Sequence, residues 1–485
     1  MLNVVWFKRD LRVSDHRPLR EAVEAGMVAP LYIIEPDFWA QPTASARQWR
    51  FVARTLAALR TQLAVLGAPL IVRVGDAVEV LESFRANTQE LVLWSHEETG
   101  DLFSRERDHR VAEWAEANGI PWHQTPQPGI IRGSPSREAW SATWTAETGT
   151  KPLPPPEAMI AHGYTPGKIV SERILYLDDD PCNDLAAGPT VARRLLKCYL
   201  ETGTENGQDG PAPRHPTVDG EPRLSAHVSW GTLSLREIRQ ALEVEFGGRT
   251  AVPVDRLLQR MRFRTDLIQR LEDQPTLQVR AMHAAFSAVE CSDSPVLAEA
   301  WCEGQTGLPI VDATMRALTQ SGWVDLDLRL LAMSVAAHHL RLDWRDFGVR
   351  LARLLTNYEP GVHWNLCQMA AGVTGFADCE IADVHAAGPR LDPEGAFVRE
   401  WVPELRRVPD AQVHTPWSMS AEQQTEANCI IGADYPASVV DFAVAGRDAA
   451  RRLEAIRSTR GFEDEARKLR FRHTERGTAI GAAAS

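Results

Sequence analysis

Cysteines are few in this chain of 485 residues, and they are scattered. The seven thiols lie at positions 182, 198, 291, 302, 367, 379 and 429, and no two of them form a CxxC pair. Zinc sites and iron–sulfur clusters need closely spaced cysteines, and disulfide scaffolds need many of them in a short secreted chain. The cysteine pattern therefore argues against a metal site and against a disulfide framework.

Long apolar runs are also missing. The apolar stretches fall well short of the roughly 20 residues that a transmembrane helix requires. The first residues, MLNVVWFKRDL, contain a strand-like apolar pentad but not the apolar core of a signal peptide. We therefore expect a protein without a membrane span, located in the cytoplasm.

Positive charge is in deficit. The chain has 53 Lys and Arg residues against 65 Asp and Glu residues, which gives a formal net charge of −12. An acidic protein can still bind nucleic acid through a local basic cleft, but it has no long-range attraction for phosphate. The composition thus gives no support for DNA as a partner.

Residues 1–125 alternate short β-rich runs with helical patterns. The β-rich runs cover 3–7, 30–35, 69–74 and 90–94, and the helical patterns cover 18–25, 46–66, 78–86 and 104–117. Alternation with crossovers of this length predicts an α/β domain with a doubly wound parallel sheet. No glycine-rich phosphate loop follows any of these strands, so the dinucleotide-binding fingerprint is absent.

The remainder is predicted to be a linker followed by an all-α domain. Residues 126–190 are rich in Pro, Gly and Ser, which is typical of a long interdomain linker. Residues 191–473 are expected to be nearly all helical apart from a polar loop at 202–221. Residues 474–485 are small and polar, and we expect a flexible tail there.

Chemical motifs are densest between Val296 and Asp378. One unbroken spacing joins Trp301, Glu303, Gly304, Thr306, Gly307, Pro309, Val311, Asp312, Ala313, Met315, Arg316, Gly322, Trp323, Arg329 and the run Asp343-Trp344-Arg345. This layout resembles the flavin-binding domain of the DNA photolyase and cryptochrome family. The opening Trp6-Phe7-Lys8-Arg9-Asp10-Leu11-Arg12 is similar to the start of that family's antenna domain, but the sequence does not identify an antenna chromophore.

The resemblance implies that the helical domain binds FAD. A flavin needs donors for its pyrophosphate, a shaped apolar slot for its ring and a tuned group at N5. Arg223-Leu224-Ser225 matches the family's phosphate-binding turn, although Glu221 stands where a hydroxyl residue is usual. Arg264 matches the family arginine that reaches the phosphates; an exposed helix arginine is the alternative interpretation.

The ring slot implied by the resemblance is partly changed. Asn357 stands where the family has an aspartate that pairs with Arg329, so that ion pair is expected to be lost. Glu359 keeps an acid at the pyrimidine edge, and His363 occupies the N5-facing position. A neutral core histidine is the alternative for His363. The cofactor-binding set is Arg223, Leu224, Ser225, Arg264, Trp323, Arg329, Asn357, Glu359, Val362 and His363.

The electron relay of the family is a row of three tryptophans, and here only one remains. The matching positions are Cys367, Trp344 and Cys291. A thiol is a far poorer hopping site than an indole. We therefore expect poor photoreduction by this route, unless Trp301, Trp323 or Trp364 supplies another path.

The lesion cleft departs most from the family. The two stacking tryptophans correspond to Phe263 and Met369, and the dimer-binding glutamate corresponds to Arg260. Phosphate-facing basic positions correspond to Asp327, next to Asp325, and to Glu380, which opposes DNA binding. The predicted substrate cavity is lined by Arg260, Phe263, Asp325, Asp327, Met369 and Glu380.

Three functions remain open from the sequence. The first is a cryptochrome-like blue-light or redox flavoprotein with weak or no DNA binding. The second is a photolyase with an unusual cleft. The third is a flavoenzyme that holds a small molecule in the former lesion cavity. The candidate catalytic residues are His363, Glu359 and Arg260.

Overall fold

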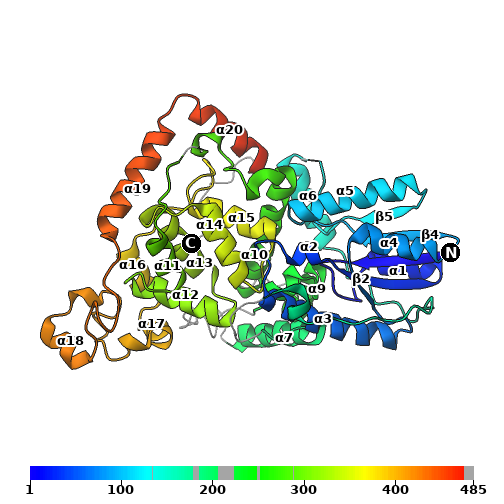
Figure 1. The fold of residues 1–485 in the computed structure, drawn as a ribbon, viewed down its shortest axis with the longest axis horizontal. Helices are drawn as coiled ribbons and strands as arrows, with labels where there is room; N and C mark the ends of the chain where they lie inside the picture. The colour runs from blue at the N-terminus through cyan, green and yellow to red at the C-terminus, as the bar shows by residue number, and fades with distance from the viewer. Residues whose placement is uncertain (134, 178–184, 206–222, 248–251, 288, 475–485) are drawn as a thin grey trace.

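The chain forms an α/β domain at one end and a helical domain at the other (Figure 1). The structure is a computed structural model that describes residues 1–133, 135–177, 185–205, 223–247, 252–287 and 289–474. The loop was predicted at 202–221, but its first residues belong to a helix that extends to Glu205; the rest of it, and residues 475–485 of the predicted tail, lie outside the described residues. No helix in the described part is both long enough and apolar enough to span a bilayer.

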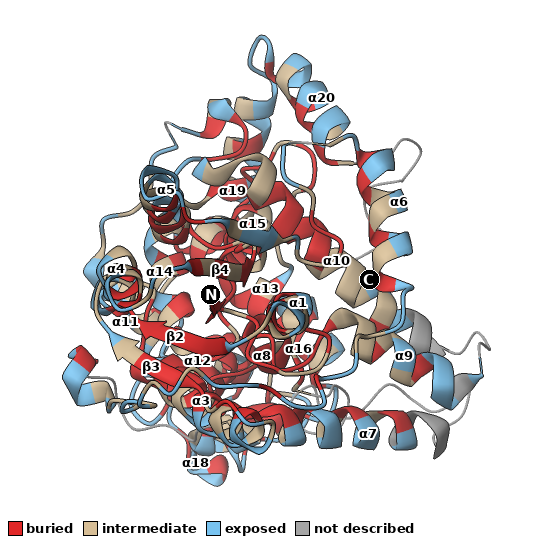
Figure 2. Cartoon of the chain, turned by 90° about the vertical axis from the view of Figure 1, so that its right-hand side faces the viewer, coloured by how far each residue is buried: buried red, intermediate tan, exposed pale blue. Residues whose placement is uncertain are grey.

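The α/β domain is built on a five-stranded parallel sheet in the order β3-β2-β1-β4-β5. Successive residues of a strand face opposite sides of a sheet. Accordingly Val5 and Phe7 of β1 (Leu2–Phe7) enter one apolar core, while Val4 and Trp6 enter another. Figure 2 shows the strands buried and the flanking helices exposed on their outer sides. The predicted α/β fold is confirmed.

The predicted elements of this domain lie close to the observed ones. The strands are β1, β2 (Val28–Ile34), β3 (Ile71–Val74) and β4 (Leu91–His96), and the helices are α1 (Arg17–Ala25), α3 (Ala46–Val65), α4 (Ala77–Ala86) and α5 (Leu102–Ala117). Two short elements were not predicted, α2 (Pro36–Trp39) and β5 (Trp122–Thr125). Each has only four residues, too few to show a periodic pattern.

The segment predicted as a linker contains a helix, α6 (Arg137–Thr148). Ser136 caps its start by accepting a hydrogen bond from the Ala139 amide. Trp140 and Trp144 are buried from one face of α6. The abundance of Pro and Gly around α6 hid this helix from composition alone. The next helix, α7 (Pro189–Glu205), begins where a helical pattern was expected.

The second domain is helical, as predicted, and most of its helices share one apolar core. Its helices are α8 (Ser225–Ser229), α9 (Leu235–Phe246), α10 (Val252–Asp273), α11 (Pro295–Cys302), α12 (Pro309–Ser321), α13 (Leu326–Ser334), α14 (Trp344–Leu354), α15 (Pro360–Ala370), α16 (Val384–Leu391), α17 (Ala396–Trp401), α18 (Ala421–Ala427), α19 (Phe442–Arg457) and α20 (Phe462–His473). A π-helical turn, Val335–His339, follows α13. Figure 1 shows α18 and α19 along the edge farthest from the sheet, and α20 at the top of the view.

A buried carboxylate explains the spacing of the tryptophan-glycine motif. Asp312 accepts hydrogen bonds from the Thr306 amide, the Thr306 hydroxyl and the Gly307 amide at 2.7–3.0 Å. It also accepts one from the Tyr435 hydroxyl at 2.5 Å. The motif therefore builds a turn, and the turn anchors the loop after α18 to α12.

Helix α3 of the α/β domain holds the two domains together. Arg47 donates to the carbonyls of Leu318, Thr319 and Leu354 at 2.7–3.0 Å, so it bonds the C-terminal carbonyls of α12 and α14. At Gly231, which has a φ of +68°, a Cβ would lie 2.2 Å from the Arg9 carbonyl oxygen. The close approach of the two domains therefore requires glycine at this position.

Candidate functional site

A cavity of about 1090 Å³ opens in the helical domain between α8, α10, the start of α13 and α15. Gly361 allows α15 to pack closely on α10, because a Cβ there would lie 2.7 Å from the Cα of Ile268. The predicted cofactor-binding residues converge on this cavity. It is lined by Leu224, Ser225, Arg264, Trp323, Arg329, Asn357, Glu359, Val362 and His363.

The remaining member of the predicted set lies beside the cavity rather than in its wall. The guanidinium of Arg223 lies over the Trp323 ring, 5.4 Å from its centroid. Ser225 connects this pair to the ring slot, since its Oγ accepts hydrogen bonds from Trp323 Nε1 at 3.1 Å and from Asn357 Nδ2 at 2.9 Å. With both acceptor positions used, the Ser225 hydroxyl proton is left to donate, as a phosphate oxygen requires.

Arg329 is a buried guanidinium without a carboxylate partner in the described residues. Its exposed fraction is 7%, and its Nη2 reaches only the amide oxygen of Asn357, at 3.5 Å. Its Nε has no hydrogen-bond partner among the described residues. Burial lowers the pKa of Arg329 to about 10, so it remains a cation at neutral pH. A buried donor in need of an acceptor suits the polar edge of a flavin ring, and we conclude that the cavity fits FAD.

Arg264 and Glu359 face each other across the cavity. Arg264 Nε donates to Glu359 Oε2 at 2.7 Å, and its Nη2 donates to the other carboxylate oxygen, so the pair is bidentate. The two side chains are 20% and 11% exposed. Arg264 can therefore reach a phosphate only with its remaining nitrogen while Glu359 holds the guanidinium in place.

His363 has a defined tautomer. Its Nε2 lies 2.8 Å from the Gly348 carbonyl oxygen, which can only accept, so Nε2 carries the proton. Its Nδ1 has no partner among the described residues. Burial lowers the pKa of His363 to about 3, so the ring is neutral at neutral pH. Of the two roles that the sequence left open, proton donor or acceptor, the geometry favours the acceptor at Nδ1.

The tryptophan relay keeps its middle member and gains a neighbour. Trp344 is 5% exposed, and its ring centroid lies 5.9 Å from that of Trp364. The Trp364 ring lies 5.1 Å from that of His363, which lines the cavity. Cys367 is fully buried with its Sγ 3.6 Å from His363 Nε2, and burial raises the pKa of this thiol. Trp364 is thus placed to connect Trp344 to the flavin cavity.

The predicted substrate-cavity residues divide into two groups. Arg260 and Phe263 line the flavin cavity. The other four do not belong to its wall; these are Asp325, Asp327, Met369 and Glu380. Asp327 is exposed, and its carboxylate interacts electrostatically with Asp325, Arg390 and Arg260. Asp327 is therefore close enough to two arginines for their charges to offset each other.

The cavity wall also contains residues that were not predicted from the sequence, among them Tyr199 and Arg256. Arg256 precedes Arg260 by one helical turn of α10, and Arg264 follows one turn later. Side chains four positions apart share a helix face, so this spacing could have identified Arg256. Tyr199 lies on α7, far away in the sequence, and no local pattern places it here.

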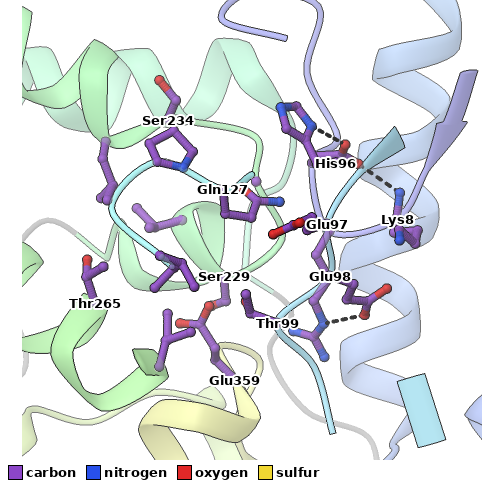
Figure 3. A pocket seen from close by; sticks show the side chains of 18 of the residues that line it. Lys8, His96, Glu97, Glu98, Thr99, Gln127, Ser229, Ser234, Thr265 and Glu359 are labelled. Carbon is purple, nitrogen blue, oxygen red and sulfur yellow. Dashed lines mark hydrogen bonds and ion pairs between the residues drawn. The ribbon is translucent and has the colours of Figure 1, made fainter. Parts of the chain in front are cut away.

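A second cavity, of about 770 Å³, lies between the two domains. Figure 3 shows Glu97 and Thr99 of the α/β domain on the side of the cavity towards Ser229 and Glu359 of the helical domain. Glu359 and Arg264 line both cavities. The Arg264–Glu359 pair therefore stands between the flavin cavity and the interdomain cavity.

Asp10 lies between two buried histidines at the edge of the interdomain cavity. His16 Nε2 and His96 Nδ1 lie 2.9 and 2.7 Å from the same Asp10 oxygen, close enough for a metal site. However, His16 Nδ1 accepts a hydrogen bond from the Leu19 amide, so its Nε2 carries a proton and donates to Asp10. These hydrogen bonds describe a carboxylate that orients two rings and not a set of metal ligands.

The fold and the site together define a class, a two-domain flavoprotein with an α/β domain and a helical FAD-binding domain. Residues 3–132 match the family model described as DNA photolyase, and residues 257–455 match the model described as the FAD binding domain of DNA photolyase. The chain belongs to the DNA photolyase and cryptochrome family, and FAD is the cofactor of the matched domain.

The chain is similar to family members along nearly all of its length. It is 27% identical to a deoxyribodipyrimidine photo-lyase of Agrobacterium fabrum, over 94% of this chain and 98% of that protein. It is also 27% identical to a cryptochrome DASH of Natronomonas pharaonis, over 90% and 98% of the two chains. The crystal structure of a class III photolyase from Agrobacterium tumefaciens superposes with a TM-score of 0.82 at 24% identity, covering 94% of this chain and 98% of that one. This last likeness concerns the fold.

Proposed function

We propose that this protein is a cryptochrome-like blue-light or redox flavoprotein that does not repair pyrimidine dimers efficiently. Bound FAD supplies absorption of blue light and one-electron chemistry. The chain's own residues hold the cofactor, exclude water from it and provide an acceptor at His363 Nδ1. The observation that carries the proposal is the changed surface next to the flavin cavity.

Stacking of a flipped dimer has little support in this structure. Phe263 and Met369, which correspond to the family's stacking tryptophans, are both partly buried against the core of the helical domain. Only Phe263 lines the flavin cavity. Stacking of a base on an aromatic ring contributes about 1–3 kcal/mol, while flipping a base out of a duplex costs a few kcal/mol. One phenylalanine and one methionine outside the wall offset little of that cost.

The charges beside the cavity also disfavour DNA. The carboxylate of Asp327 interacts electrostatically with Arg260 and Arg390 and offsets their positive charge. Glu380 is exposed and adds a second negative charge at a position where the family has a cation. Each missing phosphate contact means that one fewer counterion is released on binding, which makes the binding free energy less favourable.

A photolyase with an unusual cleft is the second candidate. The observation in its favour is that the relative in Agrobacterium fabrum is named a deoxyribodipyrimidine photo-lyase. A flavoenzyme for a small molecule is the third, supported by the two cavity arginines Arg256 and Arg260 and the nearby Asp327, which suit a zwitterion.

The deciding experiment is a repair assay on the FAD-loaded protein. Dimer-containing single- and double-stranded oligonucleotides are mixed with it at low salt, illuminated with blue light and analysed for restored pyrimidines, with a gel shift in parallel. We expect no specific shift and no efficient repair. Light-dependent repair at a useful rate would overturn the proposal and establish the photolyase function. A protein that takes up no FAD would rule out all three candidates.

A further inference from the structure

A third cavity, of about 630 Å³, opens beside Trp344. It lies between the π-helical turn, the start of α14 and helix α19, and residues just before Cys291 complete it. Much of its wall is apolar, formed by Phe286, Leu342, Val373, Leu453 and Ile456. The π-helical turn widens the helix at this point, a distortion that is frequent at functional sites. The apolar wall suits an aromatic ring.

Guanidinium groups surround this wall. Arg345 is paired with Asp343 at 2.8 Å, but Arg341 and Arg452 donate only to the backbone carbonyls of Glu290 and His338, at 3.3 and 3.2 Å. In the described residues, neither Arg341 nor Arg452 has a carboxylate within ion-pair distance. Burial and the charge of Arg341 lower the pKa of Arg452, so the two cations repel each other. Glu290 at the rim and Asp448, which acts on Arg452, offset part of this positive charge, but Arg341 and Arg452 have no ion-pair partner in the described residues and would suit a carboxylate.

A buried histidine adds one neutral acceptor to the wall. His338 is 4% exposed, and its Nε2 has no partner among the described residues. The ring hydrogen-bonds the Ala370 backbone through its other nitrogen, which must carry the proton to donate to a carbonyl. Nε2 therefore has a lone pair, and a hydroxyl group of a ligand would satisfy it.

The aromatic side of the cavity is Trp344 itself. Its ring lies 5.9 Å from Trp364, and Trp364 lies 5.1 Å from His363 in the flavin cavity. Cys291, the small residue at the family's surface tryptophan position, also lines this cavity. A ligand seated here would be separated from the flavin cavity by two indole rings in contact.

We propose that the cavity beside Trp344 binds a small phenol that carries a carboxylate, and that this ligand is the electron donor to Trp344. The role rests on the proposed light-driven flavoprotein function, whereas the binding site does not. Bound FAD would supply one-electron oxidation on illumination, and Trp364 and Trp344 are placed to pass an electron towards the flavin cavity, which would leave Trp344 oxidised. The phenol then gives one electron to the indole, its O–H bond breaks, and the proton goes to His338 Nε2. Trp344 is restored, and a phenoxyl radical with its carboxylate intact leaves.

Binding is tested first, by calorimetry on the full-length protein with and without FAD, using 4-hydroxyphenylacetate as the probe. Arg341→Gln and Arg452→Gln should each weaken binding about tenfold or more, because each removes a charge-assisted hydrogen bond. Phenylacetate, which lacks the hydroxyl, and tyramine, which lacks the carboxylate, should bind more weakly. Arg350→Gln is the matched control, an exposed arginine of α14 that bonds Cys302 and lies outside the cavity wall. Equal affinity in all variants, or no binding at millimolar probe, overturns the site.

The donor role is tested by illumination of the FAD-loaded protein. The probe should accelerate loss of the oxidised-flavin absorbance, and Trp344→Phe should abolish the acceleration while Trp401→Phe on α17 retains it. Cys291→Trp provides a variant in which the cavity is filled, so the probe should neither bind nor accelerate. Binding without acceleration overturns the inference and leaves the proposed function standing. Failure of FAD uptake overturns the proposed function, while calorimetry still decides the binding site.

Discussion

Replacement of Arg264 by methionine should weaken FAD binding by roughly 10- to 150-fold. Arg264 gives two nitrogens to Glu359 and keeps one for a phosphate oxygen. Loss of one charge-assisted hydrogen bond costs about 1.5–3 kcal/mol, which corresponds to that range in the dissociation constant. The side chain is only 20% exposed, so solvent screening reduces this value modestly.

The same substitution has a second effect. Glu359 is 9% exposed and lines the flavin cavity, and without Arg264 its carboxylate would be left unpaired there. Repulsion between this carboxylate and the negatively charged cofactor adds to the loss of the hydrogen bond. Arg264→Met combined with Glu359→Gln should therefore bind FAD several-fold more tightly than Arg264→Met alone, because the amide carries no charge.

The assay is a titration of FAD-free protein with FAD, followed by quenching of flavin fluorescence. Arg262→Met is the matched control. Arg262 lies two residues earlier on α10, donates to Ser141 and packs on the rings of Trp140 and Trp144, away from the flavin cavity. If Arg264→Met binds FAD within about threefold of the parent, a change below 1 kcal/mol, then Arg264 does not contact the phosphates and the reasoning is wrong.

Three further outcomes are expected. Arg47→Met should lower the free energy of unfolding, measured in urea, by about 3–5 kcal/mol, because three carbonyls lose this donor. As a control, Arg20→Met should change the free energy of unfolding by less than about 0.5 kcal/mol. Equal effects of the two substitutions would contradict this account of the domain contact. Burial lowers the pKa of His363 to about 3 and of His338 and His339 to about 4, so the unfolded chain binds more protons below its histidine pKa. The free energy of unfolding should be at its full value above about pH 6.5 and should fall on acidification towards pH 4. In urea melts across that range, His363→Asn should reduce the pH dependence of this free energy by about 1.4 kcal/mol per pH unit. A pH dependence unchanged by this substitution would mean that His363 is protonated in the folded state. Asp327→Arg combined with Glu380→Arg should strengthen non-specific DNA binding and make it salt-sensitive in fluorescence anisotropy, and salt-independent binding would count against the charge argument.

Local sequence patterns were sufficient to predict most helices and strands of the N-terminal domain. The strands β1 to β4 and the helices α1, α3, α4 and α5 were predicted within a few residues, because apolar periodicity and turn residues act over short distances. The elements that were not predicted are α2 and β5, which have four residues each, and α6, which lies in a segment of linker-like composition. In α6 the burial of Trp140 and Trp144 outweighs the composition around it.

The sequence by itself determined the family and the α/β and helical architecture, because one spacing of many residue types carries that information. Most residues that it assigned to the cofactor line one cavity. It could not determine how those residues pair. Arg264 and Glu359 are 95 positions apart and form one bidentate contact. The tautomer of His363 depends on the carbonyl of Gly348, on a different helix. The contact between Trp344 and Trp364 and the cavity beside it exist only because α14, α15 and α19 pack together. Protonation, pairing and electron paths depend on distances across the fold, and only tertiary packing sets those distances.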